Sequence, residues 1–268
     1  MSKNNFGKDR IKRSAKGVFL WLRGYYYHGS SYSCPSCNRS FRTMLPGGYQ
    51  SEATEKLNIV GAGLRNNNIC PFCLSTDRDR LILLYLRDYY LISKKSINVL
   101  HVSPEPALYR VLSRIKNLNY TIGTKYAEGT YYPKEISFFD LRELPYSNAT
   151  FDLIICNHVL EHIEDDRLAM SELYRVLKNN GQAILQVPIS EQLPKTLENP
   201  AVISPADRHK IFGQFDHVRV YGSDYITRLE SIGFKVEIIP SSAIQKKQNK
   251  INYALNSKEK LYIAHKML

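Results

Sequence analysis

Residues 147–163 read SNATFDLIICNHVLEHI, and this stretch decides the fold of the chain. Its centre, from Phe151 to Cys156, is a short apolar run, which is typical of a strand buried on both faces. Two polar residues, Asn157 and His158, follow at once. Open α/β sheets bind ligands at the carboxyl ends of their strands. The stretch therefore predicts a central strand whose end borders a ligand site.

A helix is predicted next, from about Asp166 to Lys178. Its apolar residues recur at the spacing of one helical face, namely Ala169, Leu173, Val176 and Leu177. Acidic residues at its start complement the helix dipole. The run Asn179-Asn180-Gly181 is expected to end the helix.

From residue 97 onward, short apolar runs alternate with helical periodicity, which is the pattern of a parallel sheet covered by helices. The predicted strands are Ile97 to Val102, Tyr120 to Lys125, Ile136 to Asp140, Phe151 to Cys156, Ala183 to Pro188, Lys235 to Ile239 and Leu261 to His265. We expect an α/β protein with a Rossmann-like, doubly wound, mostly parallel seven-stranded sheet. We expect residues 97–268 to form this domain, and residues 77–96 to form a connecting helix capped at Thr76.

The N-terminal part contains four cysteines in two matched pairs, Cys34-Pro-Ser-Cys37 and Cys70-Pro-Phe-Cys73. Two residues between thiolates allow one tight turn to direct both sulfurs at one ion, and two such turns complete a tetrahedral site suited to zinc. A redox pair or two disulfides are the alternatives, and a reducing compartment and the matched spacing disfavour both. We expect a structural zinc in a zinc-ribbon-like module over residues 31–76, and Cys156 as a core residue.

The net charge of +12 is concentrated at the two ends of the chain. Residues 1–30 carry +6 and residues 245–268 carry +5, which leaves +1 for the rest. The basic, aromatic segment 1–30 suits RNA or another anionic surface, although basic ends also serve as plain solubilising segments. No apolar run approaches the length of a membrane span, so we expect a cytoplasmic protein without one.

The phrase from Phe151 to Ile163, with the turn at Gly181 and the strand that ends at Val187-Pro188, resembles the central motifs of class I S-adenosylmethionine-dependent methyltransferases of the "type 11" branch. The resemblance covers about residues 97–240. It implies a methyltransferase that uses S-adenosylmethionine as its methyl donor.

The resemblance also assigns cofactor contacts. The residues in question are His101, Ser103, Glu105, Asp140, Leu141, Asn157 and His158. Asp140 matches the acid that pairs with the adenine amino group, and Leu141 supplies the neighbouring amide. Two departures stand out: the first loop has no glycine, and Thr124-Lys125 stands where the family has a carboxylate for the ribose. In the first loop, in place of the glycine-rich turn, Glu105 is expected to bind the ammonium group of the cofactor.

The resemblance to class I methyltransferases implies that the connection after the fifth strand covers the acceptor site, as it usually does in that family. Methyl transfer requires alignment of the acceptor and removal of its proton. Histidine suits the second task, so we expect His217 and His158 as the base and Asp216 as the residue that orients it. The candidate acceptor contacts are Arg208, His209, Gln214, Arg219 and Tyr221.

Three functions stay open from the sequence. The first is methylation of an oxygen or nitrogen atom on a small molecule or glycan. The second is RNA methylation supported by the basic ends. The third is a methyltransferase-fold binding protein that has lost catalysis, which the altered cofactor loop would explain.

Overall fold

The computed structural model describes residues 3–125 and 135–268, with the side chains of residues 3–14 left out. The N-terminal part contains α1 (Lys3–Tyr26), β1 (His28–Cys34), β2 (Arg39–Phe41), β3 (Leu45–Gly47), α2 (Glu52–Lys56) and β4 (Arg65–Ile69). Helix α3 (Asp77–Asp88) and the short η1 (Ile92–Lys94) lead to the sheet. Thr76 caps α3, as expected, and its hydroxyl accepts a hydrogen bond from the Asp79 amide.

The main sheet has seven strands in the order β12-β13-β9-β8-β5-β6-β7. They are β5 (Ile97–Val102), β6 (Leu118–Thr124), β7 (Ser137–Phe138), β8 (Phe151–Asn157), β9 (Leu177–Gln186), β12 (Phe234–Pro240) and β13 (Lys260–Lys266). All pairings from β7 to β9 are parallel, whereas β13 runs antiparallel to both of its neighbours. The fold prediction is confirmed, including every predicted strand within a few residues, except that β9 begins earlier.

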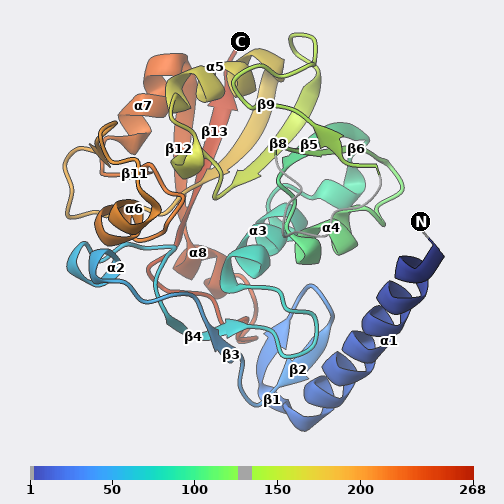
Figure 1. The fold of residues 1–268 in the computed structure, drawn as a ribbon. Coiled ribbons are helices and arrows are strands. Elements are labelled where there is room, and N and C mark those ends of the chain that lie inside the picture. Colours follow the sequence, from blue (N-terminus) through green and yellow to red (C-terminus); the bar gives the residue numbers. More distant parts are fainter. Residues whose placement is uncertain (1–2, 126–134) are drawn as a thin grey trace.

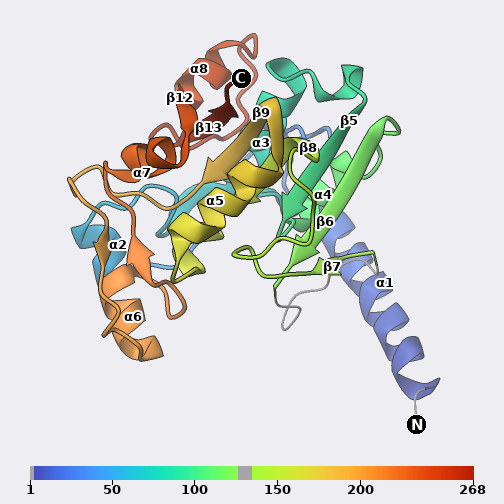
Figure 2. The ribbon, with the colours of Figure 1, turned by 90° about the horizontal axis from the view of Figure 1, so that it is seen from above.

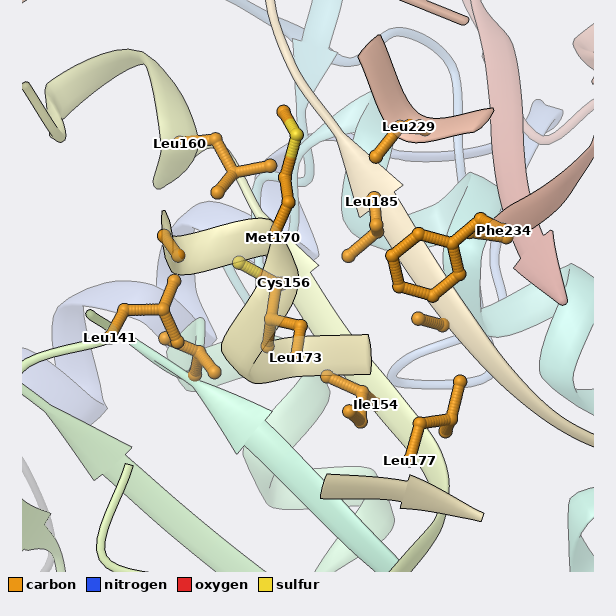
Figure 3. Packing of buried hydrophobic residues seen from close by; sticks show 14 of the residues in the cluster. Leu141, Ile154, Cys156, Leu160, Met170, Leu173, Leu177, Leu185, Leu229 and Phe234 are labelled. Atoms are coloured by element: carbon orange, nitrogen blue, oxygen red, sulfur yellow. The ribbon is translucent and has the colours of Figure 1, made fainter. Parts of the chain in front are cut away.

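Helices cover both faces of the sheet (Figures 1 and 2). On one face, α5 (Asp166–Val176) and α7 (Tyr225–Ile232) pack on β8 and β9. Figure 3 shows Met170 and Leu173 of α5 beside Ile154 and Cys156 of β8. On the other face lie α3, α4 (Pro106–Leu112) and α8 (Ser241–Lys246). The expectation that Cys156 is a core residue is confirmed, since it is fully buried.

The end of α5 differs from the prediction. The helix stops at Val176, and Leu177 is already extended and begins β9. The pairing with β8 jumps from Leu177 to Gln182, so the intervening residues bulge out of the ladder. Asn180 takes a left-handed φ of 60° there. The run that was expected to end the helix therefore forms the bulge, and Lys178 belongs to the strand.

The connection after β9 contains three short elements near the strand ends, namely β10 (Leu197–Glu198), α6 (Pro205–Phe212) and β11 (Arg219–Val220). The turn η2 (Leu160–His162) itself follows β8. Hydrogen bonds from Val218 N to Glu161 O (2.9 Å) and from Arg219 Nη1 to Leu160 O (3.1 Å) fasten this connection to η2. The roof over the strand ends is thus fixed to the end of β8.

Helix α1 projects from the body in both views (Figures 1 and 2). Its last turns contact the rest of the chain, where Gly24 lies against Phe72 and Arg23 Nε donates to Pro71 O at 2.6 Å. Trp21 and Tyr25 stack on each other and are exposed. In residues 3–125 and 135–268 we find no helix with the length and apolar character needed to cross a membrane.

Arg80 of α3 is fully buried and joins three segments of the chain. Its guanidinium donates five hydrogen bonds to backbone carbonyls, at distances between 2.7 and 3.1 Å. The acceptors are Asn67, Asn68, Ser75, Tyr253 and Ala254. Carbonyl dipoles therefore compensate this buried charge, and they come from both cysteine-bearing and C-terminal segments.

Glu259 provides a pH-dependent contribution to stability. Its side chain is nearly fully buried and accepts a hydrogen bond from Gln186 Nε2 at 2.6 Å. Burial raises the pKa of Glu259 to about 7. A carboxyl whose folded-state pKa is raised favours the protonated form, so the native state loses stability as pH rises from the unfolded pKa, near 4.5, through 7.

The full shift corresponds to about 3.5 kcal/mol, since one pKa unit corresponds to about 1.4 kcal/mol. We therefore expect the stability of Glu259→Gln relative to the parent protein to be about 2.5 kcal/mol greater at pH 8 than at pH 5, where little of the shift is yet lost. Urea denaturation of both proteins at the two pH values measures this. An equal stability difference at pH 5 and pH 8 would contradict the raised pKa.

Candidate active site and zinc site

A cavity of about 670 Å³ lies at the carboxyl ends of β5, β6 and β8. Its walls include Ser103, Thr124, Asp140, Leu141 and His158. The roof of the cavity comes from the connection after β9, through Arg208, Gln214, Asp216 and Val218. This is the position at which open α/β sheets bind ligands.

Asp140 stands at the mouth of this cavity as part of a charged group. Its carboxylate accepts from the Arg142 amide at 2.9 Å and from Arg142 Nη2 at 2.8 Å, and Lys125 Nζ lies 2.8 Å away. The Arg142 side chain, helped by Lys125, holds the pKa of Asp140 well below its usual range. Asp140 is therefore an anion, and a ligand amino group would share it with these two cations.

The loop after β5 adopts its turn without glycine. Ser103 takes a left-handed φ of 48° and its amide donates to Gly123 O at 2.7 Å, which holds the loop against β6. Glu105 caps the backbone of α4, and His101 Nε2 lies 2.9 Å from its carboxylate. Asn157 donates its side-chain amide to the same carboxylate. Burial opposes ionisation, yet the His101 contact holds the pKa of Glu105 below its usual value.

Five further ionisable groups gather at η2. Glu161 is almost fully buried, and the ring nitrogens of His158 (3.1 Å), His162 (4.0 Å) and His217 (4.0 Å) surround its Oε1. Asp216 pairs with His162 Nδ1 at 3.2 Å. Burial opposes the charged forms of the whole group. It lowers the pKa of His158 to about 4, while the neighbouring imidazoles hold the pKa of Glu161 near 2 against the effect of burial.

A second cavity, of about 350 Å³, lies on the other side of these histidines. The N-terminal part supplies one wall, through Gly48, Tyr49, Gly61 and Arg78, among others. Gly61 has a φ of +85°, and a Cβ there would lie 3.2 Å from His158 Cε1, so the backbone approaches the imidazole closely. Three residues line both cavities, namely His158, His162 and Gln214.

The four paired cysteines converge as a separate group. Cys34 and Cys73 sulfurs lie 3.5 Å apart, and those of Cys37 and Cys70 lie 3.8 Å apart. The edge of a tetrahedron with Zn–S bonds of about 2.3 Å is about 3.8 Å long, so the set fits zinc. The Cys73 amide points at Cys70 Sγ (3.5 Å), as in a zinc knuckle. The residue after each pair has a left-handed φ, 54° at Asn38 and 65° at Leu74.

Comparison with known proteins agrees with this geometry. A family model described as "Methyltransferase domain" matches residues 97–185. A probable S-adenosylmethionine-dependent methyltransferase of Mycolicibacterium smegmatis is 28% identical over 128 residues, which is 47% of this chain and 46% of that protein. Residues 97–185 therefore correspond to a methyltransferase domain.

Two further likenesses are narrower in what they show. An uncharacterized protein of Methanocaldococcus jannaschii is 39% identical over 56 residues, 21% of this chain and 24% of that protein. The chain thus spans less than half of the length of either curated relative. The crystal structure of the [4+2]-cyclase SpnF superposes with a TM-score of 0.50 at 16% identity, covering 71% of this chain and 82% of that one. At this identity the likeness concerns the fold alone.

The structure brings most of the expected site residues to the methyltransferase domain's two cavities. Those that line the larger cavity are Ser103, Asp140, Leu141, His158, Arg208, Gln214 and Asp216, and His217 and Arg219 line the smaller. Glu105 and Asn157 form the hydrogen-bonded group at the end of β5 and β8. Glu128, the first acidic residue after β6 in the sequence, lies outside the described residues.

Several expectations need correction. His101 is fully buried and both ring nitrogens have partners, Tyr120 (2.7 Å) and Glu105 (2.9 Å), so it supports Glu105 and does not face the cavity. Tyr221 is also fully buried and donates to Asp166 at 2.8 Å. His209 is exposed on α6 and lines neither cavity.

Arg219 and Asp216 also differ from the expectation. Arg219 lines the smaller cavity, but its buried guanidinium binds Glu198 and the carbonyls of Leu160 and Glu164, so most of its donors are already used. It stabilises the roof of the site. Asp216 contacts His162, and so it orients that ring and not His217.

Glu161 and His162 were not expected as site residues, although both lie in the phrase HVLEH. The sequence feature that could have indicated them is the spacing of Glu161 three residues after His158, because one helical turn brings side chains at this spacing together. Gly61 and Arg78 gave no such signal, because they approach the site only through the packing of the N-terminal part.

We expect the protein to contain one zinc ion per chain bound to the four cysteines. Cys37→Ser removes one of four ligands, so zinc content should fall and residues 31–76 should become sensitive to protease, because structural zinc stabilises small modules by about 10 kcal/mol or more. Metal analysis and limited proteolysis measure both effects. Cys156→Ala, which changes an unrelated buried thiol, should keep the zinc, and equal loss in both variants would contradict the assignment.

Proposed function

We propose that the protein transfers the methyl group of S-adenosylmethionine to an oxygen or nitrogen atom of a small-molecule or glycan acceptor. The observation that carries this proposal is the junction of the two cavities at His158, His162 and Gln214. The cofactor would occupy the larger cavity, beside Asp140 and Leu141. The acceptor would enter the smaller one, so that its nucleophile meets the methyl group at the junction.

The chemistry at this junction is an in-line displacement on the methyl carbon of a sulfonium. The protein has to align the acceptor atom with the C–S bond and remove a proton from it. His158 is placed for the second task, because it lines both cavities and its Nε2 has no hydrogen-bond partner among residues 3–125 and 135–268. Glu161, 3.1 Å from Nδ1, would stabilise the imidazolium that results.

The cofactor pocket differs from the family pattern in how it would hold the ends of S-adenosylmethionine. Glu105 provides a carboxylate for the ammonium group, and its anchoring by His101 and Asn157 fixes its position. Asp140 provides the carboxylate for the adenine amino group. At the ends of β5 and β6, the hydroxyl groups of Ser103 and Thr124, 3.1 Å apart, stand where a ribose acid is usual.

A small acceptor is favoured over RNA by the position of the basic helix. Figures 1 and 2 both place α1 on the side of the molecule away from α2 and α6. The second cavity lies beside those two helices, where Thr54 and Phe212 line it. A nucleic acid bound along α1 would therefore not lead into the cavity that meets the cofactor pocket.

Cofactor binding tests the proposal first. We expect S-adenosylhomocysteine to bind the full chain in calorimetry, and Asp140→Ala to weaken this binding by about tenfold, the effect of losing one charge-assisted hydrogen bond. Asp152→Ala is a matched control. Asp152 also pairs with a lysine at 2.8 Å and is equally exposed, but it lies at the start of β8, outside the lining of the larger cavity.

Absence of binding at millimolar S-adenosylhomocysteine would contradict the proposed activity and favour the catalytically inactive alternative. Once binding is shown, release of S-adenosylhomocysteine can be followed with panels of hydroxylated small molecules, sugars, amines and RNA. Turnover with RNA alone would overturn the choice of acceptor.

A further inference from the structure

The acidic and imidazole groups at η2 form a second group of potential metal ligands, distinct from the cysteines. One ligand atom each from Glu161, His162 and His217 lies within 4.8 Å of the other two. Glu161 Oε1 is 4.0 Å from the Nε2 atoms of both histidines. These separations are too long for hydrogen bonds, and a shift of a few tenths of an ångström by each ligand would give bonds of about 2.0–2.2 Å to one ion.

The Glu161 carboxylate is an unsatisfied anion. The residue is 1% exposed, and neither of its carboxylate oxygens has a hydrogen-bond partner in the described part of the chain. His158 Nδ1 is 3.1 Å from Oε1 but lacks the alignment of a hydrogen bond. A buried carboxylate without a partner costs several kcal/mol. A cation bound at this point would remove that cost.

His162 is held as metal-binding histidines usually are. Asp216 lies 3.2 Å from His162 Nδ1, which fixes the tautomer that leaves Nε2 unprotonated and directed toward Glu161. Gln214 in turn donates to Asp216 at 2.8 Å. The His217 ring packs edge-on against His162, with centroids 4.7 Å apart.

The backbone fixes these ligands before any ion arrives. Glu161 and His162 are consecutive residues of η2, whereas His217 comes from the connection after α6. The hydrogen bond from Val218 N to Glu161 O, 2.9 Å long, joins the two segments directly beside the ligands. Little ordering therefore remains to be done on binding.

We propose that Glu161, His162 and His217 bind a divalent transition-metal cation at the junction of the two cavities. Two imidazoles and one carboxylate suit zinc, iron, cobalt or manganese better than magnesium, which prefers oxygen ligands. Three protein ligands leave coordination positions open. These positions face the cavities, since His162 lines both of them and Glu161 and His217 line the smaller.

The chemical role of this metal site rests on the proposed methyl transfer, to which the ion would add activation of the acceptor. An acceptor hydroxyl bound to the cation loses its proton more readily, and His158 Nε2 takes that proton. The oxygen lone pair then forms the bond to the methyl carbon as the C–S bond breaks, and its electrons remain on sulfur in S-adenosylhomocysteine. The acceptor class is accordingly a compound with a hydroxyl and a second oxygen that can bind the same ion.

Manganese is a suitable probe, because it binds imidazole and carboxylate ligands and competes poorly for four thiolates. Protein that has been treated with a chelator and still holds its cysteine-bound zinc is titrated with Mn²⁺ and followed by electron paramagnetic resonance. We expect one Mn²⁺ per chain, with spin-echo modulation from imidazole nitrogen. Absence of this ion in the parent protein would overturn the proposal.

Variants locate the ion. Glu161→Gln and His217→Ala should each weaken Mn²⁺ binding at least tenfold, whereas His209→Ala, which changes an exposed histidine of α6 in the same connection, should not. Binding that persists in both ligand variants would overturn the assignment. S-adenosylhomocysteine binding by each variant shows that it is folded, and the nitrogen modulation in the parent protein decides the case if a variant does not fold.

The two proposals fail differently. If S-adenosylhomocysteine binds but Mn²⁺ does not, the metal site is wrong and the methyltransferase proposal stands. If Mn²⁺ binds at these residues but S-adenosylhomocysteine does not, the metal site stands without its proposed role in methyl transfer.

Discussion

The buried guanidinium of Arg80 holds together the parts of the chain on which the site depends. A charge in the protein interior is tolerated only when its hydrogen bonds are complete. Here five backbone carbonyls complete them, two just before the second cysteine pair, one just after it and two near the C-terminus. Because the carbonyls come from separate segments, Arg80 fixes the second zinc knuckle, α3 and the chain before β13 in one arrangement.

The consequence reaches the active site through the N-terminal part of the chain. Arg78, on the same helix as Arg80, donates to Gly61 O at 3.0 Å, and Gly61 lies against His158. A backbone bridge between Val60 and Ile189 holds the same segment to the end of β9. The cysteine-bearing part is therefore a structural wall of the second cavity and not a separate appendage. A structural zinc at the cysteines would stabilise this wall from a distance, without contact with the acceptor.

The sequence predicted the sheet well because its signals are local. Buried strands such as Phe151–Asn157 are short apolar runs, and each reveals itself without knowledge of its neighbours. The cysteine spacing predicted a four-sulfur group for a similar reason, since one tight turn contains each pair. The end of α5 was less readable, because a bulge at Asn180 looks the same in sequence as a helix stop.

The site was only partly predictable, because its details depend on contacts between distant segments. Nothing in the sequence shows that Arg219 donates to the carbonyl of Leu160 in η2, or that His101 contacts Glu105 from inside the core. The pairing of Asp216 with His162, and not with its neighbour His217, depends on how the connection after β9 crosses η2. Residue types in a phrase indicate chemistry, but the fold decides which groups meet.

The junction of the two cavities is the central claim, and a crystal structure with S-adenosylhomocysteine tests it most directly. The arrangement predicts the adenine beside Asp140, the amino group near Glu105, and the sulfur at the junction, in contact with His158 or His162 and facing the second cavity. A sulfur directed away from that cavity, or a ligand bound elsewhere on the chain, would contradict it.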